Sequence, residues 1–293
     1  MKQALIPLVY FAQSKRPLTL KQIRRYSWGR EFGLDELKQI LKKTGVSQAG
    51  EFYYLSEEHL EEIPARQQRS EKFWRKVKRY SWVFANVPFL RMAAVSNTLA
   101  YNYVSAWSDI DLFIVAAEDR LWTTRGILLL WLTLLGVRAR GRNKYMRFSP
   151  EILVDETAID LSPCALADDY LVHYQIADIT PVWNTAFFDR FWSANAWLKG
   201  KLPVAYRSPL RRVEFERRVQ SSWFAWLLGK ILSGGFGDRV EAWARRRQRW
   251  LIERAKNRLG VDPNVIIEDH VIETHFHGQR ADVRDAIEEF LAS

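Results

Sequence analysis

The sequence is poor in the residues that build disulfides and zinc sites. Its 293 residues include one cysteine, Cys164. A single thiol excludes an internal disulfide and a cysteine-rich zinc site, and it is typical of a protein in a reducing, cytoplasmic compartment. We therefore expect a cytoplasmic protein held together by apolar packing, since 48% of its residues are hydrophobic.

A long hydrophobic run is also lacking. The most apolar stretch, residues 127–136 (ILLLWLTLLG), is about half the roughly 20 residues that a membrane-spanning helix needs. We expect a buried helix there and no membrane span. The first residues, MKQALIPLVYFAQ, have too short an apolar stretch and no small-residue cleavage pattern, so they indicate a first helix and not a secretory signal.

Acidic residues are scarcer than basic ones. The 44 Lys and Arg residues against 34 Asp and Glu give a formal net charge of +10, which favours a polyanionic partner such as RNA, DNA or an acidic membrane surface. Tryptophan is abundant by contrast, at 13 residues. Such rings can fill a core, bind a partner or lie at a membrane interface, and the core is the commonest of these places.

The N-terminal residues 1–60 have the pattern of a winged-helix domain. Three short helical segments and a strand pair follow one another at residues 4–13, 19–28, 34–45 and 46–56. Thr19 is placed to cap the second helix, and Gly45 to end the third. The lysines of the third helix, Lys38, Lys42 and Lys43, favour nucleic-acid binding. Packing on a neighbouring domain, or dimerisation, is the alternative.

A basic amphipathic helix is expected at residues 66–87, before Pro88. Its apolar residues recur every three or four positions and should face inward: Phe73, Val77, Tyr80 and Phe84. The opposite side is basic, which is commonly just a solvated face. Here, however, the basic helix directly precedes an acidic motif in the sequence.

That motif is an apolar strand, DIDLFIVAA, interrupted by Asp109 and Asp111. Side chains at i and i+2 lie on one face of a strand, so the two carboxylates should project together. An unpaired carboxylate in an apolar interior costs several kcal/mol or shifts its pKa until it is neutral. A divalent cation is the simplest way to offset both charges, and Mg²⁺ prefers carboxylate oxygens beside substrate phosphates.

Phosphoryl transfer with two metal ions also needs a third carboxylate from a neighbouring strand. The strand-like segment within KYMRFSPEILVDETAIDLS offers two candidates. Glu151 lies inside the apolar run, as a metal-facing acid would, and is the preferred candidate. Asp155 lies at its end, where an aspartate commonly caps a turn instead.

The stretch VSNTLAYNYVSAWSDIDLFIV resembles the signature of the DNA polymerase beta nucleotidyltransferase superfamily, a Gly-Ser turn followed by an Asp-x-Asp strand. Residues 73–203 are similar to a prokaryotic family of uncharacterised nucleotidyltransferase-domain proteins, at VPFLRMAAV, SDIDLFIVAAEDRLWTTR and SANAWLKGKLP. The resemblance implies that Asp109 and Asp111 bind metal. It also implies that Asn97, Thr98 and Ser108 contact a nucleoside triphosphate.

The sequence departs from this signature at the turn. Asn97 and Thr98 stand where the family has Gly-Ser. Asparagine tolerates the left-handed conformation and Thr98 keeps the hydroxyl, so the turn can still form. A side chain now stands, however, where glycine lets backbone N–H groups approach phosphate closely. The sequence is therefore compatible with both an active and a degenerate nucleotide site.

Other polar residues give weaker patterns. Arg120 and Arg125 could bind phosphate, or could pair with Glu118 and Asp119. His275 and His277 form a His-x-His pair without a third ligand at metal spacing, which favours an ordinary surface pair. A nucleophile-elbow pattern is lacking, so a hydrolase triad is not supported.

The C-terminal residues 210–259 are expected to be helical and very basic, with a break at GGFGD. Arginines alternate with tryptophans here: Trp243, Arg245, Arg246, Arg247, Arg249 and Trp250. Binding of a phosphate backbone and a helical hairpin solvated by its arginines are both compatible with this pattern. The tail DVRDAIEEFLAS should form a closing helix whose acids could pair with the basic surface.

We therefore expect an α/β (α+β) protein of three parts. These are a winged helix (1–60), a nucleotidyltransferase-like domain with a mixed sheet (66–205) and a basic helical region (206–293). The expected function is Mg²⁺-dependent transfer of a nucleoside monophosphate from a nucleoside triphosphate to a hydroxyl of RNA, protein or a small molecule. The alternatives are a catalytically degenerate nucleic-acid-binding or regulatory protein, and a scaffold that uses its Trp-rich helices.

Overall fold

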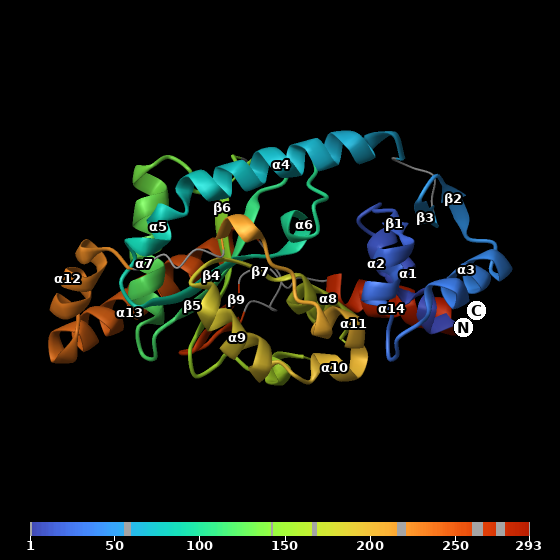
Figure 1. Cartoon of the computed structure of the whole chain (residues 1–293). Coiled ribbons are helices and arrows are strands. Elements are labelled where there is room, and N and C mark those ends of the chain that lie inside the picture. The colour runs from blue at the N-terminus through green and yellow to red at the C-terminus, as the bar shows by residue number, and fades with distance from the viewer. Residues whose placement is uncertain are drawn as a thin grey trace.

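The structure, a computed structural model, describes residues 2–55, 60–141, 143–165, 169–215, 221–259, 266–273 and 279–292. It is a mixed α/β protein built around a mixed six-stranded sheet. The N-terminal helices lie at one end of the molecule and α12 lies at the other (Figure 1). Within the described residues, no helix is both long and apolar enough to cross a membrane.

The N-terminal part has the expected order of three helices and a strand pair. Its elements are η1 (Lys2–Ala4), α1 (Ile6–Ala12), β1 (Leu18–Thr19), α2 (Leu20–Tyr26), α3 (Leu34–Lys43), β2 (Ser47–Ala49) and β3 (Phe52–Tyr54). Thr19 and Gln22 form a capping box at the start of α2, which satisfies two backbone N–H groups. The short β1 strand extends the hairpin to a three-stranded sheet of order β1-β3-β2.

The central sheet has the strand order β7-β4-β5-β6-β9-β8. Its strands are β4 (Leu90–Val95), β5 (Ile110–Ala116), β6 (Phe148–Asp155), β7 (Thr180–Trp183), β8 (Ile266–Ile267) and β9 (Val271–Glu273). Among the described strands, β5 and β6 pair in parallel, joined by a crossover through α7, and the other pairs are antiparallel. Every residue of β5 is buried, because both faces of the sheet are covered.

Helices cover both faces of the sheet. The helices that follow the N-terminal part are α4 (Ile63–Tyr80), α5 (Trp82–Ala85), α6 (Asn97–Ala100), α7 (Leu121–Leu134), α8 (Tyr170–Asp178), α9 (Thr185–Ala194), α10 (Leu198–Lys201), α11 (Pro203–Arg207), α12 (Trp223–Ile231), α13 (Gly234–Leu259) and α14 (Gln279–Ala292). Short 3-10 turns occur at η2 (Leu60–Glu62), η3 (Ser162–Cys164) and η4 (Val213–Phe215). Alternate residues of β5 enter separate cores: Leu112 packs with α4 and α7, and Phe113 packs with α8 and α9.

Helix α8 joins the sheet to the N-terminal part. Its residues Val172 and Ile176 face the sheet, whereas Leu171 and Tyr174 pack with α1, α2 and α14. Tyr26 of α2 donates a hydrogen bond to buried Asp178. This second core therefore fixes the N-terminal helices to the end of the sheet that carries the acidic motif.

Three details differ from the sequence expectations. The apolar run 127–136 is buried on one side only, with Leu134 of α7 70% exposed. The GGFGD segment lies within the first turns of α13, and the break falls just before it, after α12. Helix α14 packs against α1 and α8, where its apolar residues Val283 and Ile287 find a core. Its closing role is thus apolar, and in the described part of the chain its acids Asp285 and Glu288 pair with Arg284 of the same helix.

Candidate metal centre

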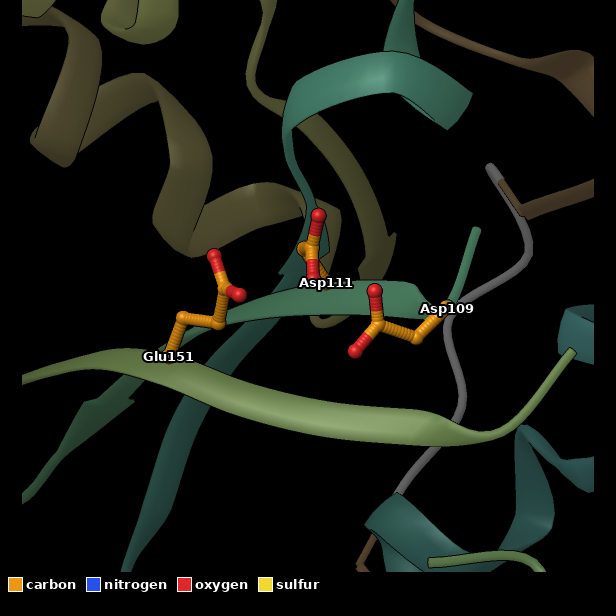
Figure 2. Close-up of side chains that lie close together, drawn as sticks. All are labelled: Asp109, Asp111 and Glu151. Atoms are coloured by element: carbon orange, nitrogen blue, oxygen red, sulfur yellow. The ribbon is translucent and has the colours of Figure 1, made fainter. Parts of the chain in front are cut away.

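Three carboxylates meet at the start of β5. Asp109 precedes the strand, Asp111 lies on it, and Glu151 comes from the parallel neighbour β6. Figure 2 shows the three side chains pointing toward one another. Each contributes an oxygen atom to a group in which all three atoms lie within 4.8 Å of one another. This spacing suits a shared cation.

The pairing of β6 with β5 places Glu151 in this group, at an irregularity in the register. Leu112 pairs with Pro150 and Phe113 pairs with Ile152, so Glu151 is an extra residue without a partner on β5. Pro150 lacks the N–H that a regular ladder would use, and proline inside a sheet is typical of such bulges. Asp111 pairs with Ser149, and side chains two residues apart lie on one face of a strand, so Glu151 faces the same side of the sheet as Asp111.

Burial gives the cluster unusual protonation behaviour. Asp111 and Glu151 are buried, and Asp109 is half-buried. Burial, followed by the charge of Asp109, raises the pKa of Asp111 to about 7. Burial and the charge of Asp111 raise the pKa of Glu151 well above its usual range, and burial also raises the pKa of Asp109. The cluster therefore holds protons near neutral pH unless another positive charge replaces them.

Asn97 is bonded directly to this cluster. Its Nδ2 donates to Asp111 Oδ2 at 3.1 Å and to Glu151 Oε2 at 2.9 Å. The backbone of Asn97 has a φ of +55°, the left-handed conformation that glycine adopts at no cost. The turn expected from the sequence therefore forms with asparagine, and its side chain points toward the carboxylates.

A second oxygen of Asp111 is available to a ligand. Its Oδ1 is buried and has no hydrogen-bond partner among the described residues. An orphaned buried carboxylate oxygen is costly, and coordination to a cation removes that cost. Since all three donors are carboxylates, the site fits a hard divalent cation.

Asp155, the other candidate for the third acid, lies at the far end of β6 and outside this cluster. Its Oδ1 accepts hydrogen bonds from the backbone N–H and the hydroxyl of Thr157, so it caps the turn after the strand. Its Oδ2 lies 2.6 Å from Nδ1 of His270. This contact crosses 115 positions of the sequence, so no local pattern indicated it.

The remaining candidate residues surround the cluster less directly. The Oγ of Ser108 accepts a hydrogen bond from the N–H of Ser105, and the half-buried Thr98 accepts one from Tyr103 through its carbonyl. The sequence reasoning missed Lys144, an exposed residue whose positive charge lowers the pKa of all three acids. A loop lysine carries no sequence pattern of its own.

The two arginines considered for phosphate binding contact α13. Arg120 pairs with Asp238, and Arg125 donates to the side-chain oxygen of Gln248. Their contacts thus hold α7 against α13. Arg120 also donates to the backbone carbonyl of Asp119, but among the described contacts neither arginine forms an ion pair with the carboxylate of Glu118 or Asp119. His275 and His277 lie outside the described residues.

Comparison with protein families, with curated protein sequences and with solved structures gave no match to this chain. The chemistry of the cluster therefore rests on its own geometry: three converging carboxylates, an asparagine amide bonded to two of them, and a buried oxygen of Asp111 for which the described part of the chain supplies no hydrogen-bond donor.

Proposed function

We propose that this protein is a Mg²⁺-dependent nucleotidyltransferase, which moves a nucleoside monophosphate from a nucleoside triphosphate to a hydroxyl acceptor. The observation that carries the proposal is the convergence of Asp109, Asp111 and Glu151 from two parallel strands. Three acids, two of them buried, have little structural reason to share one place unless they bind a cation. Hard oxygen ligands favour Mg²⁺, which is the usual partner of nucleotide phosphates.

The carboxylates and the polar residues near them would have separate roles in this reaction. Asp109, Asp111 and Glu151 would hold Mg²⁺, which neutralises phosphate charge and positions the reacting oxygens when bound. One carboxylate would take the proton of the acceptor hydroxyl, whose oxygen forms a bond to the α-phosphorus. The bond from that phosphorus to the bridging oxygen breaks, and pyrophosphate leaves. Thr98, Ser108 and the turn at Asn97 would orient the triphosphate, beside the positive charge of Lys144.

Transfer of label tests this proposal. The protein is incubated with Mg²⁺, each of the four α-³²P-labelled nucleoside triphosphates, and RNA, a protein extract or small hydroxyl compounds. We expect a labelled product that is lost in Asp111→Asn and Glu151→Gln. Asp119→Asn, an exposed aspartate just beyond the other end of β5, is the matched control and should retain transfer. Absence of transfer from every nucleotide would contradict the proposal.

One observation favours a second candidate, a degenerate member of such a fold that binds nucleic acid or regulates a partner. The Asn97 amide already donates to two of the three acids, which partly offsets their charge in place of a metal ion. Exposed lysines of α3, Lys42 and Lys43, would then bind a phosphate backbone. Calorimetry separates the two candidates: salt-dependent binding of RNA or DNA, without binding of a nucleoside triphosphate in Mg²⁺, selects the second.

A further inference from the structure

Exposed apolar side chains gather on the two C-terminal helices. Among the described residues, sixteen large hydrophobic side chains are exposed, and nine of these lie on α12 and α13. On α12 they are Trp223, Phe224, Trp226, Leu227 and Ile231. On α13 they are Phe236, Trp243, Trp250 and Leu251. Scattered exposed apolar residues are ordinary, whereas a concentration of this kind marks an interaction surface.

Helix α13 carries aromatic rings and arginines along one face. Phe236, Trp243 and Trp250 recur every seven residues, which is two helical turns, and all are exposed. Exposed arginines occupy the same side, three between these rings and one just after Trp250: Arg239, Arg246, Arg247 and Arg254. The guanidinium groups of Arg247 and Arg254 lie 4.7 and 5.1 Å from the centre of the Trp250 ring. This face is both aromatic and cationic.

The opposite face of α13 holds the helix to the protein. Glu241 accepts hydrogen bonds from the first N–H groups of α7, at Trp122 and Thr123. Asp238 pairs with Arg120, and buried Ala244 joins the core. Two of the acids of α13 are thus used in packing, and the outward face is left with a strong excess of positive charge.

Helix α12 adds an apolar surface beside α5 and α7. The centre of the Phe224 ring lies 6.2 Å from the centre of the Trp131 ring, which in turn lies 5.7 Å from the centre of the Trp82 ring. Ser222, the N-cap of α12, is bonded to Ala85 and Asn86 at the end of α5. The exposed Leu130 and Leu134 of α7 lie on the helix that carries Trp131. Figure 1 shows α12 and the first turns of α13 at the end of the molecule opposite α1–α3.

We propose that α12 and the exposed face of α13 dock the protein on an anionic phospholipid bilayer. Tryptophans and aliphatic side chains would enter the boundary between headgroups and acyl chains, and the arginines would bind lipid phosphates. The helices would lie on the surface and not cross it. This inference is independent of the chemistry at the acidic cluster.

The composition of the surface selects this partner over others. A nucleic acid would use the arginines and rings, but Leu227, Ile231 and Leu134 would gain nothing from phosphates or base edges. A second copy of the chain would place the same arginines against one another, and like charges repel. An anionic bilayer satisfies the cations and the aliphatic groups together.

Flotation of the full-length protein with lipid vesicles tests the proposal. Vesicles of phosphatidylcholine are compared with vesicles of phosphatidylcholine and phosphatidylglycerol in a ratio of about two to one. We expect flotation with the anionic vesicles only, together with a blue shift of tryptophan fluorescence. The double variant Trp226→Ser/Trp243→Ser should reduce partitioning by at least about tenfold. Trp107→Ser, which removes an 84% exposed ring outside this surface, should leave it unchanged.

A charge-matched pair separates a specific surface from general attraction. Arg246→Glu/Arg247→Glu should abolish flotation, whereas Lys42→Glu/Lys43→Glu, with the same change in net charge on exposed α3, should retain it. Circular dichroism establishes that each variant is folded. Three results would each overturn the proposal: no flotation, equal loss in both charge variants, or loss of RNA binding in the arginine variant with vesicle binding unchanged.

Discussion

The side-chain amide of Asn97 lies between two acids of the candidate metal centre, and its nearest contact to Asp111 is 3.1 Å, from Nδ2 to Oδ2. The same nitrogen donates to Glu151 at 2.9 Å. One neutral donor therefore supplies part of the positive potential that the buried carboxylates need. Because a cation would bind the same carboxylates, Asn97 and a metal ion both offset their negative charge.

Asn97→Gly is expected to make the protein more dependent on metal. Glycine suits the φ of +55° and removes both hydrogen bonds, which in a charged pair contribute about 1–3 kcal/mol each. Without metal the variant should unfold more easily, and Mn²⁺ or Mg²⁺ should raise its Tm by more than in the natural protein. Asn102→Gly is the matched control, because Asn102 also has a positive φ (58°) but bonds Trp74 instead. An equal metal response in both variants would contradict the role of Asn97.

Asp111→Asn is expected to stabilise the protein without metal and to abolish its response to metal. At pH 8 the buried Asp111, whose pKa is about 7, must be ionised, and an amide of the same shape avoids that cost. The gain should exceed about 1 kcal/mol in denaturant unfolding. It should shrink at pH 5, where the natural carboxyl is already protonated. Asp119→Asn, outside the cluster, should change neither quantity, and a destabilised Asp111→Asn would argue against a strained metal centre.

The sequence allowed the helices and strands to be predicted where its patterns are local. The capping residue Thr19 predicted the start of α2, and the near-continuous apolar run from 109 to 117 predicted β5 and the meeting of Asp109 with Asp111. Glu151 was preferred as the third acid because it interrupts an apolar run, although its meeting with Asp111 depends on the pairing of β6 with β5. Local patterns thus identified the acidic residues but not the strand pairing that brings them together.

Contacts between distant segments could not be predicted in this way. The bond from Asn97 to the acids depends on a side-chain orientation set by tertiary packing, and the sequence indicated only its backbone conformation. The same holds for Asp155 with His270, and for Glu241, which accepts from the N-terminus of α7. Exposure of Leu134 also escaped prediction, because the apolar run around it carries no polar face.

The Asp155–His270 pair is expected to make stability depend on pH. Its hydrogen bond raises the pKa of His270, so the folded protein binds this proton more tightly than the unfolded chain. The contribution is fully present below the ordinary histidine pKa of about 6.5 and is lost as the pH rises through the raised value. Since the imidazole is half exposed, solvent screening limits the effect to about 0.5 kcal/mol. The free energy of unfolding, measured in urea at pH 6 and pH 9, should lack this pH-dependent contribution in His270→Gln. An unchanged pH profile in the variant would show that the pair contributes nothing.

In the acidic cluster, metal binding and metal-free stability should depend on pH in opposite directions. The ordinary pKa of an aspartic acid is 3.8 and that of Asp111 is raised to about 7, so between these values the folded protein binds more protons than the unfolded chain. Stability without metal therefore falls as the pH rises through this window. A metal ion must displace the protons of Asp111 and Glu151, so its stabilising effect should grow over the same range.

Thermal unfolding with and without Mn²⁺ at pH 5.5, 6.5, 7.5 and 8.5 measures this linkage. Near pH 7 each unit increase in pH should raise the apparent metal affinity by up to about tenfold for each proton released. In Asp111→Asn/Glu151→Gln, which keeps the shape of the cluster but cannot release these protons, the shift in Tm should be absent at every pH. Metal stabilisation that is independent of pH, or that survives in the double variant, would mean that the ion binds elsewhere. The carboxylates would then be a protonated structural cluster, bonded through Asn97 and without a metal.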